Sequence, residues 1–425
     1  MRIVQIAPPW FPVPPVGYGG IERVVYDLTE GLLNIGCEVI LCAPAGSTSS
    51  APIIESVPRP VGLNLTEAQK RRHLVESSRA AYKLALDLGA DLIHDHTDYI
   101  PRRDFPIPVV RTIHGPATSA AVDEYMRMTR RGDHFVAISA RQRELFNRQA
   151  RNQYGPGAAI AIEGVVHNPL DVASAPFYPK EKKRGYIAFL GRCHWEKSPD
   201  GAIRISQATG IPLMMALRVT TEEQAYYDAV VRPLVESIKN LAKLVGEVSG
   251  VEKDELIGRA GAVIFPSPWE EPFGLVISEA AARGTPVVAL ARGSAPEIIV
   301  DGVTGYLCND EDEMAQAIPR AMELDPADCR AHALATFDRD LIAGQYLAVF
   351  ERVLNSRKKS SRSHRATPKL AAAPVSPDIV IASAMIEQGT GSPAIPSALS
   401  RTLVDADDMT SLVSTDVGET IGSMA

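Results

Sequence analysis

The sequence predicts an α/β fold built from two successive domains, each with a parallel sheet. The chain has 425 residues, which exceeds the usual size of one domain and favours two. Short apolar runs alternate with amphipathic helical stretches, which is the pattern of βαβ units. Around 166–179 three prolines interrupt the alternation, and a charged turn at 180–184 precedes a second α/β series.

The first series contains strands and helices that can be placed in order. Its first helix has one apolar face, formed by Val24, Val25, Leu28, Leu32 and Ile35. Gly89 ends the long second helix, because glycine commonly follows the last helical residue. We expect strands at 2–7, 39–43, 91–94, 109–114 and 135–139, and helices at 22–35 and 66–88.

The second series repeats this pattern before the composition changes. We expect strands at 186–190, 212–217, 243–245, 262–265 and 286–290, and helices at 199–209 and 338–354. Beyond 354 the chain is rich in Ala, Ser, Thr and Pro, and it cannot bury enough apolar surface to fold. We therefore predict an N-terminal domain at 1–172, a C-terminal domain at 173–354, whose final helix can pack back on the first, and a disordered tail at 355–425.

Composition excludes several classes of protein. The net charge of -7 argues against nucleic-acid binding, which needs a basic surface. Five scattered cysteines without a C-x-x-C motif argue against a disulfide framework and a structural zinc site. No apolar run has the length of a signal-peptide core or a membrane span. We expect a cytoplasmic protein.

One short motif follows the first strand of each series. Gly17, Gly19 and Gly20 lead into a helix, where free N–H groups and the helix dipole favour a phosphate. Arg192 and Lys197 are two cations that could neutralise a diphosphate. Each motif alone is also compatible with a flexible turn or a solvated charged loop.

The string P-S-P-W-E-E-P-F-G-L-V-I-S-E-A-A-A-R-G-T-P at 266–286 is more specific. It places Glu271 in a loop and Glu279 on the helix that follows. A loop carboxylate can accept hydrogen bonds from sugar hydroxyls, and a helix carboxylate can hold a ribose diol. Gly274 allows backbone amides to approach a phosphate or hexose. A surface role would explain either glutamate alone, but not the ordered string.

This string resembles the donor-site signature of retaining glycosyltransferases with the GT-B fold, in particular a bacterial branch of glycosyltransferase family 4. The similarity runs in order from residue 1 to about 354. It includes A-P-P-W-F-P-V-P-P-V-G-Y-G-G-I-E-R-V-V at the start, T-I-H-G at 112–115, H-N-P-L-D at 167–171, G-R-C-H-W-E-K at 191–197 and P-E-I-I-V-D-G-V-T-G at 296–305. It implies two Rossmann-like domains facing a central cleft, the first binding the acceptor and the second the nucleotide sugar.

The resemblance also implies a role for each matched residue. The implied catalytic residues are His114, Arg192, Lys197 and Glu271. The implied donor-binding residues are Gly19, Gly20, Arg192, Lys197, Gly246, Glu247, Val248, Glu271, Phe273, Gly274, Leu275 and Glu279. The chain departs from the family pattern at Ser198 and Pro169, where glycine is usual, which puts the donor loop and the hinge in doubt.

The implied reaction is a transfer of a hexose from a UDP- or GDP-linked donor, with UDP slightly favoured, and with retention of configuration. The acceptor, a sugar, glycolipid or small molecule, is not identified. The two cations would replace a metal ion, and we expect no cofactor. Growing charge on the leaving diphosphate would be stabilised by Arg192, Lys197 and backbone amides.

Other functions remain open from the sequence. Nucleotide-sugar epimerases and phosphorylases can use the same fold, and a binding protein with an inactive site is a further alternative. His94, His96 and Asp98 resemble part of a metal-dependent hydrolase motif, although Tyr99 stands where that motif has histidine. Basic clusters at 70–72 and 127–131 would allow a weak peripheral membrane contact, but a solvated basic face is the simpler interpretation.

Overall fold

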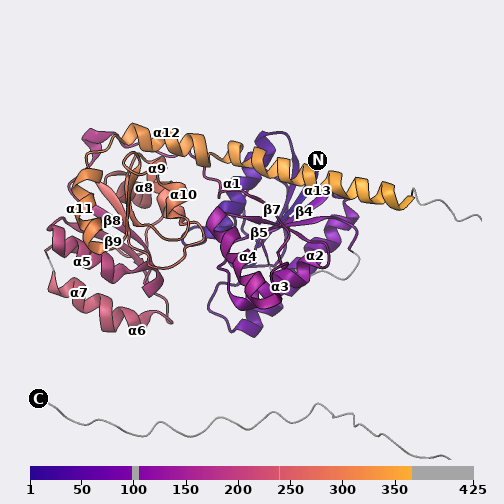
Figure 1. Ribbon diagram of the computed structural model, residues 1–425, viewed down its shortest axis with the longest axis horizontal. Coiled ribbons are helices and arrows are strands. Elements are labelled where there is room, and N and C mark those ends of the chain that lie inside the picture. Colours follow the sequence, from indigo (N-terminus) through magenta and orange to yellow (C-terminus); the bar gives the residue numbers. More distant parts are fainter. Residues whose placement is uncertain (98–104, 239, 366–425) are drawn as a thin grey trace, which may run out of the picture. The chain divides into compact units, whose positions relative to one another are not determined.

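The computed structural model of the chain describes residues 1–97, 105–238 and 240–365 (Figure 1). Within these ranges the N-terminal lobe contains a seven-stranded parallel sheet in the order β3-β2-β1-β4-β5-β6-β7. Its strands are β1 Arg2–Ile6, β2 Glu38–Ala43, β3 Ile53–Glu55, β4 Leu92–Asp95, β5 Val109–Ile113, β6 His134–Ala137 and β7 Ile162–Val165. Its helices are α1 Gly20–Asn34, α2 Glu67–Asp87, α3 Ser119–Thr129 and α4 Ala140–Tyr154.

The C-terminal lobe repeats the architecture. Its described strands form a six-stranded parallel sheet in the order β10-β9-β8-β11-β12-β13. They are β8 Ile187–Arg192, β9 Leu213–Arg218, β10 Ala242–Leu244, β11 Ala262–Phe265, β12 Val287–Leu290 and β13 Gly305–Cys308. The helices are α5 Pro199–Thr209, α6 Gln224–Tyr226, α7 Arg232–Ser237, α8 Gly250–Gly258, α9 Leu275–Ala282, α10 Ala295–Ile298, α11 Glu311–Ala321 and α12 Pro326–Phe337, with short helical turns at η1 Lys180–Lys182, η2 Trp195–Lys197 and η3 Tyr227–Val231.

Each sheet has a point at which the strand order reverses. In the N-terminal lobe the reversal lies between β1 and β4, and in the C-terminal lobe between β8 and β11. Ligands of open parallel sheets bind beyond the carboxyl ends of the strands at such points, because the flanking connections leave on opposite faces. The motifs predicted from the sequence follow these strands.

The last described helix, α13 Arg339–Arg365, packs on the N-terminal lobe. It lies beside α1 (Figure 1), and its Ile342, Tyr346 and Phe350 are buried in a core that also contains Ile3 of β1. The predicted end at residue 354 is wrong, since the helix continues to Arg365. Residues 355–365 include neither glycine nor proline, which would stop a helix. The rest of the predicted tail, 366–425, lies outside the described residues.

Three strands that we did not predict, β3, β7 and β13, share one feature. Each is short and lies at the edge of its sheet. An edge strand is less completely buried than a central one, so its sequence lacks the continuous apolar run of a central parallel strand. None of the helices in the described ranges combines the length and the apolar character that a membrane span requires.

Candidate functional site

Lys197 and Glu271 form an ion pair at the switch point of the C-terminal lobe. Lys197 follows β8, Glu271 follows β11, and the Lys197 Nζ contacts Glu271 Oε2. The side chains are 20% and 13% exposed, so the pair is only partly accessible to solvent. The indole N–H of Trp269 also donates to Glu271 Oε2 at 2.8 Å, which fixes the carboxylate.

Arg192, at the end of β8, lies between two carboxylates that the sequence analysis did not single out. Its Nη1 is 3.2 Å from Glu223 Oε1, and its Nη2 is 3.3 Å from Glu196 Oε2. Glu223 is buried, and it also accepts the backbone N–H of Thr220. The guanidinium is therefore held by neighbours at the strand end rather than extended freely into solvent.

The backbone conformation of Ser198 shows why glycine is usual at this position. Its φ is +53°, and among the described residues no other non-glycine residue has a positive φ. Left-handed backbone is costly for a residue with a Cβ atom. Ser198 nevertheless leads directly into α5, and its hydroxyl lies 3.3 Å from Asp200 Oδ1. The substitution therefore leaves the turn between Lys197 and α5 in place.

The loop that carries Glu271 is held tightly from one side. The backbone O of Glu271 accepts the N–H of Ser294 at 3.0 Å, and a Cβ atom on Gly293 would lie 2.4 Å from the Glu271 N. Gly274, with φ +77°, is the N-cap of α9, so the first amides of this helix point out of its end. Phe273 before it is buried. Glu271, Gly274 and Leu275 thus lie together at the start of α9.

Glu279 lies on α9, as the sequence predicts, and it is buried. Lys253 of α8 donates to its Oε1 at 2.5 Å. Burial acts to raise the pKa of Glu279, but the charges of Lys253 and Arg283 outweigh it, so the pKa lies below its ordinary value. Glu279 is therefore an anion that can accept hydrogen bonds. Sequence reasoning missed Lys253, which has no motif around it.

The glycine-rich turn after β1 contacts two predicted donor residues of the C-terminal lobe. The backbone N–H of Tyr18 donates to Glu247 Oε1 at 3.1 Å. A Cβ atom on Gly20 would lie 3.2 Å from Leu275 Cδ1, and one on Gly19 would lie 2.6 Å from Pro15 Cβ. The guanidinium of Arg218, also missed from the sequence, lies 4.1 Å from the centre of the Tyr18 ring.

Glu22, in the first turn of α1, is a buried carboxylate beside this turn. Burial raises the pKa of Glu22 to about 7. Between pH 4.5, the ordinary pKa, and about pH 7, Glu22 therefore keeps its proton in the folded protein but has lost it in the unfolded chain. Stability should fall as the pH rises through this range, by up to about 3 kcal/mol.

We expect Glu22→Gln to remove this loss. The free energy of unfolding of the variant, relative to wild type, should rise between about pH 5 and about pH 8 in urea titrations. Glu236→Gln is the control, because Glu236 is exposed and its replacement should have the same small effect at both pH values. An equal effect of Glu22→Gln at both pH values would contradict the assignment.

His114 follows β5 and is paired with His96, which follows β4. The distance from His96 Nδ1 to His114 Nε2 is 2.9 Å, and the rings are stacked. Burial lowers the pKa of His114 to about 4, so its imidazole is neutral near pH 7. His94 Nε2 is 2.9 Å from Thr112 Oγ1, which in turn contacts the hydroxyl of Tyr346 at 2.9 Å.

The described residues include only part of the alternative metal site that we predicted at His94, His96 and Asp98. Asp98 lies outside the described residues. Within them, no group of three or more His, Cys, Asp or Glu side chains is arranged to hold a metal ion. His94 Nε2 and His96 Nδ1 make the hydrogen bonds to Thr112 and His114, whereas His94 Nδ1 and His96 Nε2 are buried without a partner among the described residues.

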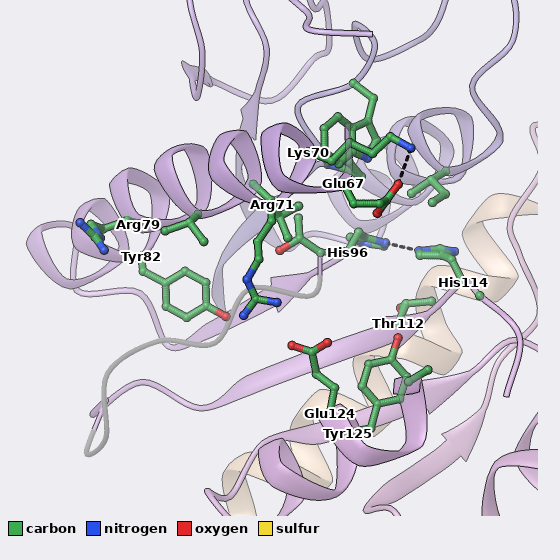
Figure 2. Close-up of a pocket in the computed structure, with 18 of the residues that line it drawn as sticks. Glu67, Lys70, Arg71, Arg79, Tyr82, His96, Thr112, His114, Glu124 and Tyr125 are labelled. Carbon is green, nitrogen blue, oxygen red and sulfur yellow. Dashed lines mark hydrogen bonds and ion pairs between the residues drawn. The ribbon is translucent and has the colours of Figure 1, made fainter. Parts of the chain in front are cut away.

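A cavity of about 1250 Å³ extends from His114 along α2 (Figure 2). Pro8, Trp10 and Ile21 line it from the elements around β1, and Tyr125 lines it from α3. The basic face that we expected at 70–72 and 127–131 is solvated, since Arg71, Arg72, Arg127, Arg130 and Arg131 are exposed and Lys70 is half-buried. Lys70, Arg71 and Arg131 also line this cavity, whereas Arg72 pairs with Glu76.

A buried ionic network supports one wall of the cavity. Arg111 of β5 donates to Asp95 Oδ2 at 2.7 Å and to Asp133 Oδ2 at 2.9 Å. It also donates to the hydroxyl of Tyr82 and to the backbone O of Thr97, two residues that line the cavity. Arg111 and Asp95 are 2% and 0% exposed, so the charges depend on one another.

The predicted site residues thus form separate groups in the described structure. Lys197, Glu271, Gly274 and Leu275 lie together in the C-terminal lobe. Glu247 and the glycine turn are joined by the Tyr18 hydrogen bond. Among the described residues, His114 makes no hydrogen bond or ring contact with the Lys197–Glu271 pair; it faces the cavity instead.

Comparisons with known proteins agree with this architecture. The family model described as Glycosyltransferase Family 4 matches residues 18–153, and the model described as Glycosyl transferases group 1 matches residues 228–334. A glycogen synthase of Mycobacterium tuberculosis is 26% identical over 391 residues, covering 80% of this chain and 90% of that protein. A phosphatidyl-myo-inositol mannosyltransferase of Mycobacterium leprae is 27% identical over 387 residues, covering 84% and 99%.

Solved structures share the fold. AviGT4, a glycosyltransferase involved in avilamycin A biosynthesis, has a TM-score of 0.61 at 24% identity, covering 83% of this chain and 98% of that one. HepE of Anabaena, in complex with UDP-glucose, has a TM-score of 0.61 at 18% identity, covering 84% and 100%. Together, fold and matches define a glycosyltransferase with the GT-B fold. Within that class, the chain is similar to glycosyltransferase family 4, whose model matches residues 18–153.

Proposed function

We propose that the protein transfers a hexose from a nucleotide diphosphate sugar to a hydroxyl group of an acceptor, with retention of configuration and without a metal ion. The observation that carries the proposal is the Lys197–Glu271 pair at the switch point between β8 and β11. This position combines a cation for the diphosphate with a carboxylate for the sugar. A UDP-linked donor is favoured over a GDP-linked one, which the UDP-glucose complex of HepE supports.

The mechanism assigned to these residues is charge stabilisation. As the glycosidic bond breaks, negative charge grows on the leaving diphosphate, and Lys197, Arg192 and the amides of 273–275 stabilise it. The acceptor hydroxyl attacks from the same face, and its proton passes to the leaving phosphate. Glu271 holds the hydroxyls of the transferred sugar and does not act as a covalent nucleophile. Neutral His114 lies beside the sugar.

The remaining donor residues bind the nucleotide in this proposal. Glu279 accepts hydrogen bonds from the ribose, and its low pKa supports this role. Gly246, Glu247 and Val248, in the loop after β10, line the base. Gly19 and Gly20 approach the phosphates, and the steric crowding that a Cβ atom would meet there supports a requirement for glycine.

A thermal-shift panel tests the donor site. UDP, GDP and ADP, and their glucose, mannose and N-acetylglucosamine conjugates, are each added in the presence of EDTA. We expect UDP and one UDP-sugar to raise the melting temperature, because a ligand that binds only the folded state stabilises it by mass action. Stabilisation that appears only after a divalent metal ion is restored would overturn metal independence, and no stabilisation by any nucleotide would overturn the donor site.

A further inference from the structure

The cavity beside His114 has a charge opposite to that of the protein as a whole. The net charge of the chain is -7, yet among the described residues five basic side chains line the cavity against two acidic ones. The basic residues are Lys70, Arg71, Arg79, Lys83 and Arg131, and the acidic ones are Glu67 and Glu124. The neighbouring His96 and His114 add no charge near pH 7, because burial lowers the pKa of both.

Most of this charge comes from one face of α2. Arg71, Arg79 and Lys83 lie on the same side of the helix as Tyr82, all lining the cavity. In the described part of the chain, none of these three cations forms an ion pair or hydrogen bond, whereas Lys70 is held by Glu67 at 2.7 Å. Arginines elsewhere, such as Arg72, pair with carboxylates. Within the described ranges the cavity therefore holds three cations, Arg71, Arg79 and Lys83, that pair with no carboxylate.

The side chain of Arg71 extends into the cavity. Figure 2 shows its side chain extending from α2 between Tyr82 and His114, with the guanidinium in the cavity, whereas Arg79 lies at the far end. A guanidinium offers a planar pair of donors that matches a phosphate or carboxylate. From Arg71 to Lys83 the helix rises about 18 Å, which is longer than one sugar ring.

We propose that this cavity binds an acceptor that carries a phosphate group, with Arg71 as the residue that recognises the phosphate. The inference rests on the proposed function only in placing the acceptor hydroxyl at His114. Arg79 and Lys83 then contact a more distant part of an elongated acceptor. The phosphate could belong to a free sugar or polyol phosphate or to a lipid headgroup, which share this chemistry.

Trp10 lines the same cavity, so its fluorescence can report ligand binding without any turnover. The probes are inorganic phosphate, glucose 6-phosphate and glucose, added to the full-length protein while tryptophan fluorescence is recorded. We expect glucose 6-phosphate to bind at least roughly tenfold more tightly than glucose, because hydrogen bonds to charged groups are the stronger ones. Trp10→Phe should abolish the signal and identify its source.

Arg71→Gln and Arg72→Gln form a matched pair of variants. Arg72 is the next residue on α2 and is exposed like Arg71, but it pairs with Glu76 and does not line the cavity. Arg71→Gln should raise the Kd of glucose 6-phosphate roughly tenfold or more and remove the preference over glucose, whereas Arg72→Gln should change the Kd less than about twofold. Equal Kd values for the two variants, or equal binding of glucose and its phosphate, would overturn the proposal.

Two further measurements separate the sources and the two proposals. Vesicles of phosphatidylcholine with and without phosphatidic acid test the lipid source. Binding that requires the acidic lipid and is lost in Arg71→Gln alone supports a headgroup. Equal loss in both variants indicates a general membrane surface and overturns the proposal that the cavity binds the phosphate.

UDP stabilisation of the same variants reports on the donor site separately. No binding of phosphate, glucose 6-phosphate or acidic vesicles would overturn the inference even if UDP binds.

Discussion

Replacing Lys197 with alanine is expected to lower kcat by roughly two to three orders of magnitude, with a smaller effect on donor affinity. The ammonium group lies at the switch point where the leaving diphosphate gains charge, so its contribution is greatest in the transition state. Steady-state kinetics with the nucleotide sugar that the stabilisation panel identifies would measure kcat and KM separately. Lys197→Arg should recover part of kcat, because it retains the charge.

Arg204→Ala is the control for this experiment. Arg204 also forms ion pairs, with Asp200 and Glu311, but it lies 45% exposed on α5 and has no place in the proposed site. Its replacement should leave kcat within about twofold of wild type, since exposed pairs contribute little. A kcat of Lys197→Ala equal to that of Arg204→Ala would show that the ammonium group does not act in catalysis.

Arg111→Ala is expected to cost about 3–5 kcal/mol of stability, because it leaves the buried carboxylate of Asp95 without its cation. The loss should be visible as a lower urea midpoint and as faster hydrogen exchange in β4 and β5, the strands that carry the pair. The Tyr82 hydroxyl and the Thr97 backbone O also lose their donor, so the wall of the cavity should loosen with them.

The exposed pair of Arg72 and Glu76 gives the comparison for stability. Its side chains are 77% and 54% exposed, and Arg72→Ala should cost less than about 1 kcal/mol. If Arg111→Ala unfolds at the same urea concentration as Arg72→Ala, the buried network contributes no more than a surface pair. That result would mean that Asp95 takes up a proton or that water enters when the guanidinium is removed.

Much of the fold could be predicted from sequence because its central strands are buried on both faces. The strand at 262–265 and the helix at 199–209 were predicted with the bounds that β11 and α5 have. The edge strands β3, β7 and β13 were missed because partial burial weakens the apolar pattern. The end of α13 was missed because composition alone does not mark where a helix of polar residues stops.

The candidate site could be predicted less completely, and the reason is also physical. Residues within ordered motifs, such as Glu271 and Glu279, could be proposed as site residues because their spacing along one chain segment is informative. Lys253 and Glu223 were missed because each contacts its partner only through the tertiary fold. The cationic cavity was missed for a similar reason: helical spacing places Arg71 and Lys83 on one side of α2, but only folding shows what that side faces.

The return of α13 to the first lobe has a consequence for how the protein is made. The core of that lobe, including the side chain of Tyr346 against Thr112, is completed by residues that the ribosome adds only after those of the second lobe. The lobe is therefore not a contiguous folding unit. During synthesis the apolar surface of its central strands therefore stays uncovered until the second lobe has emerged and α13 reaches α1.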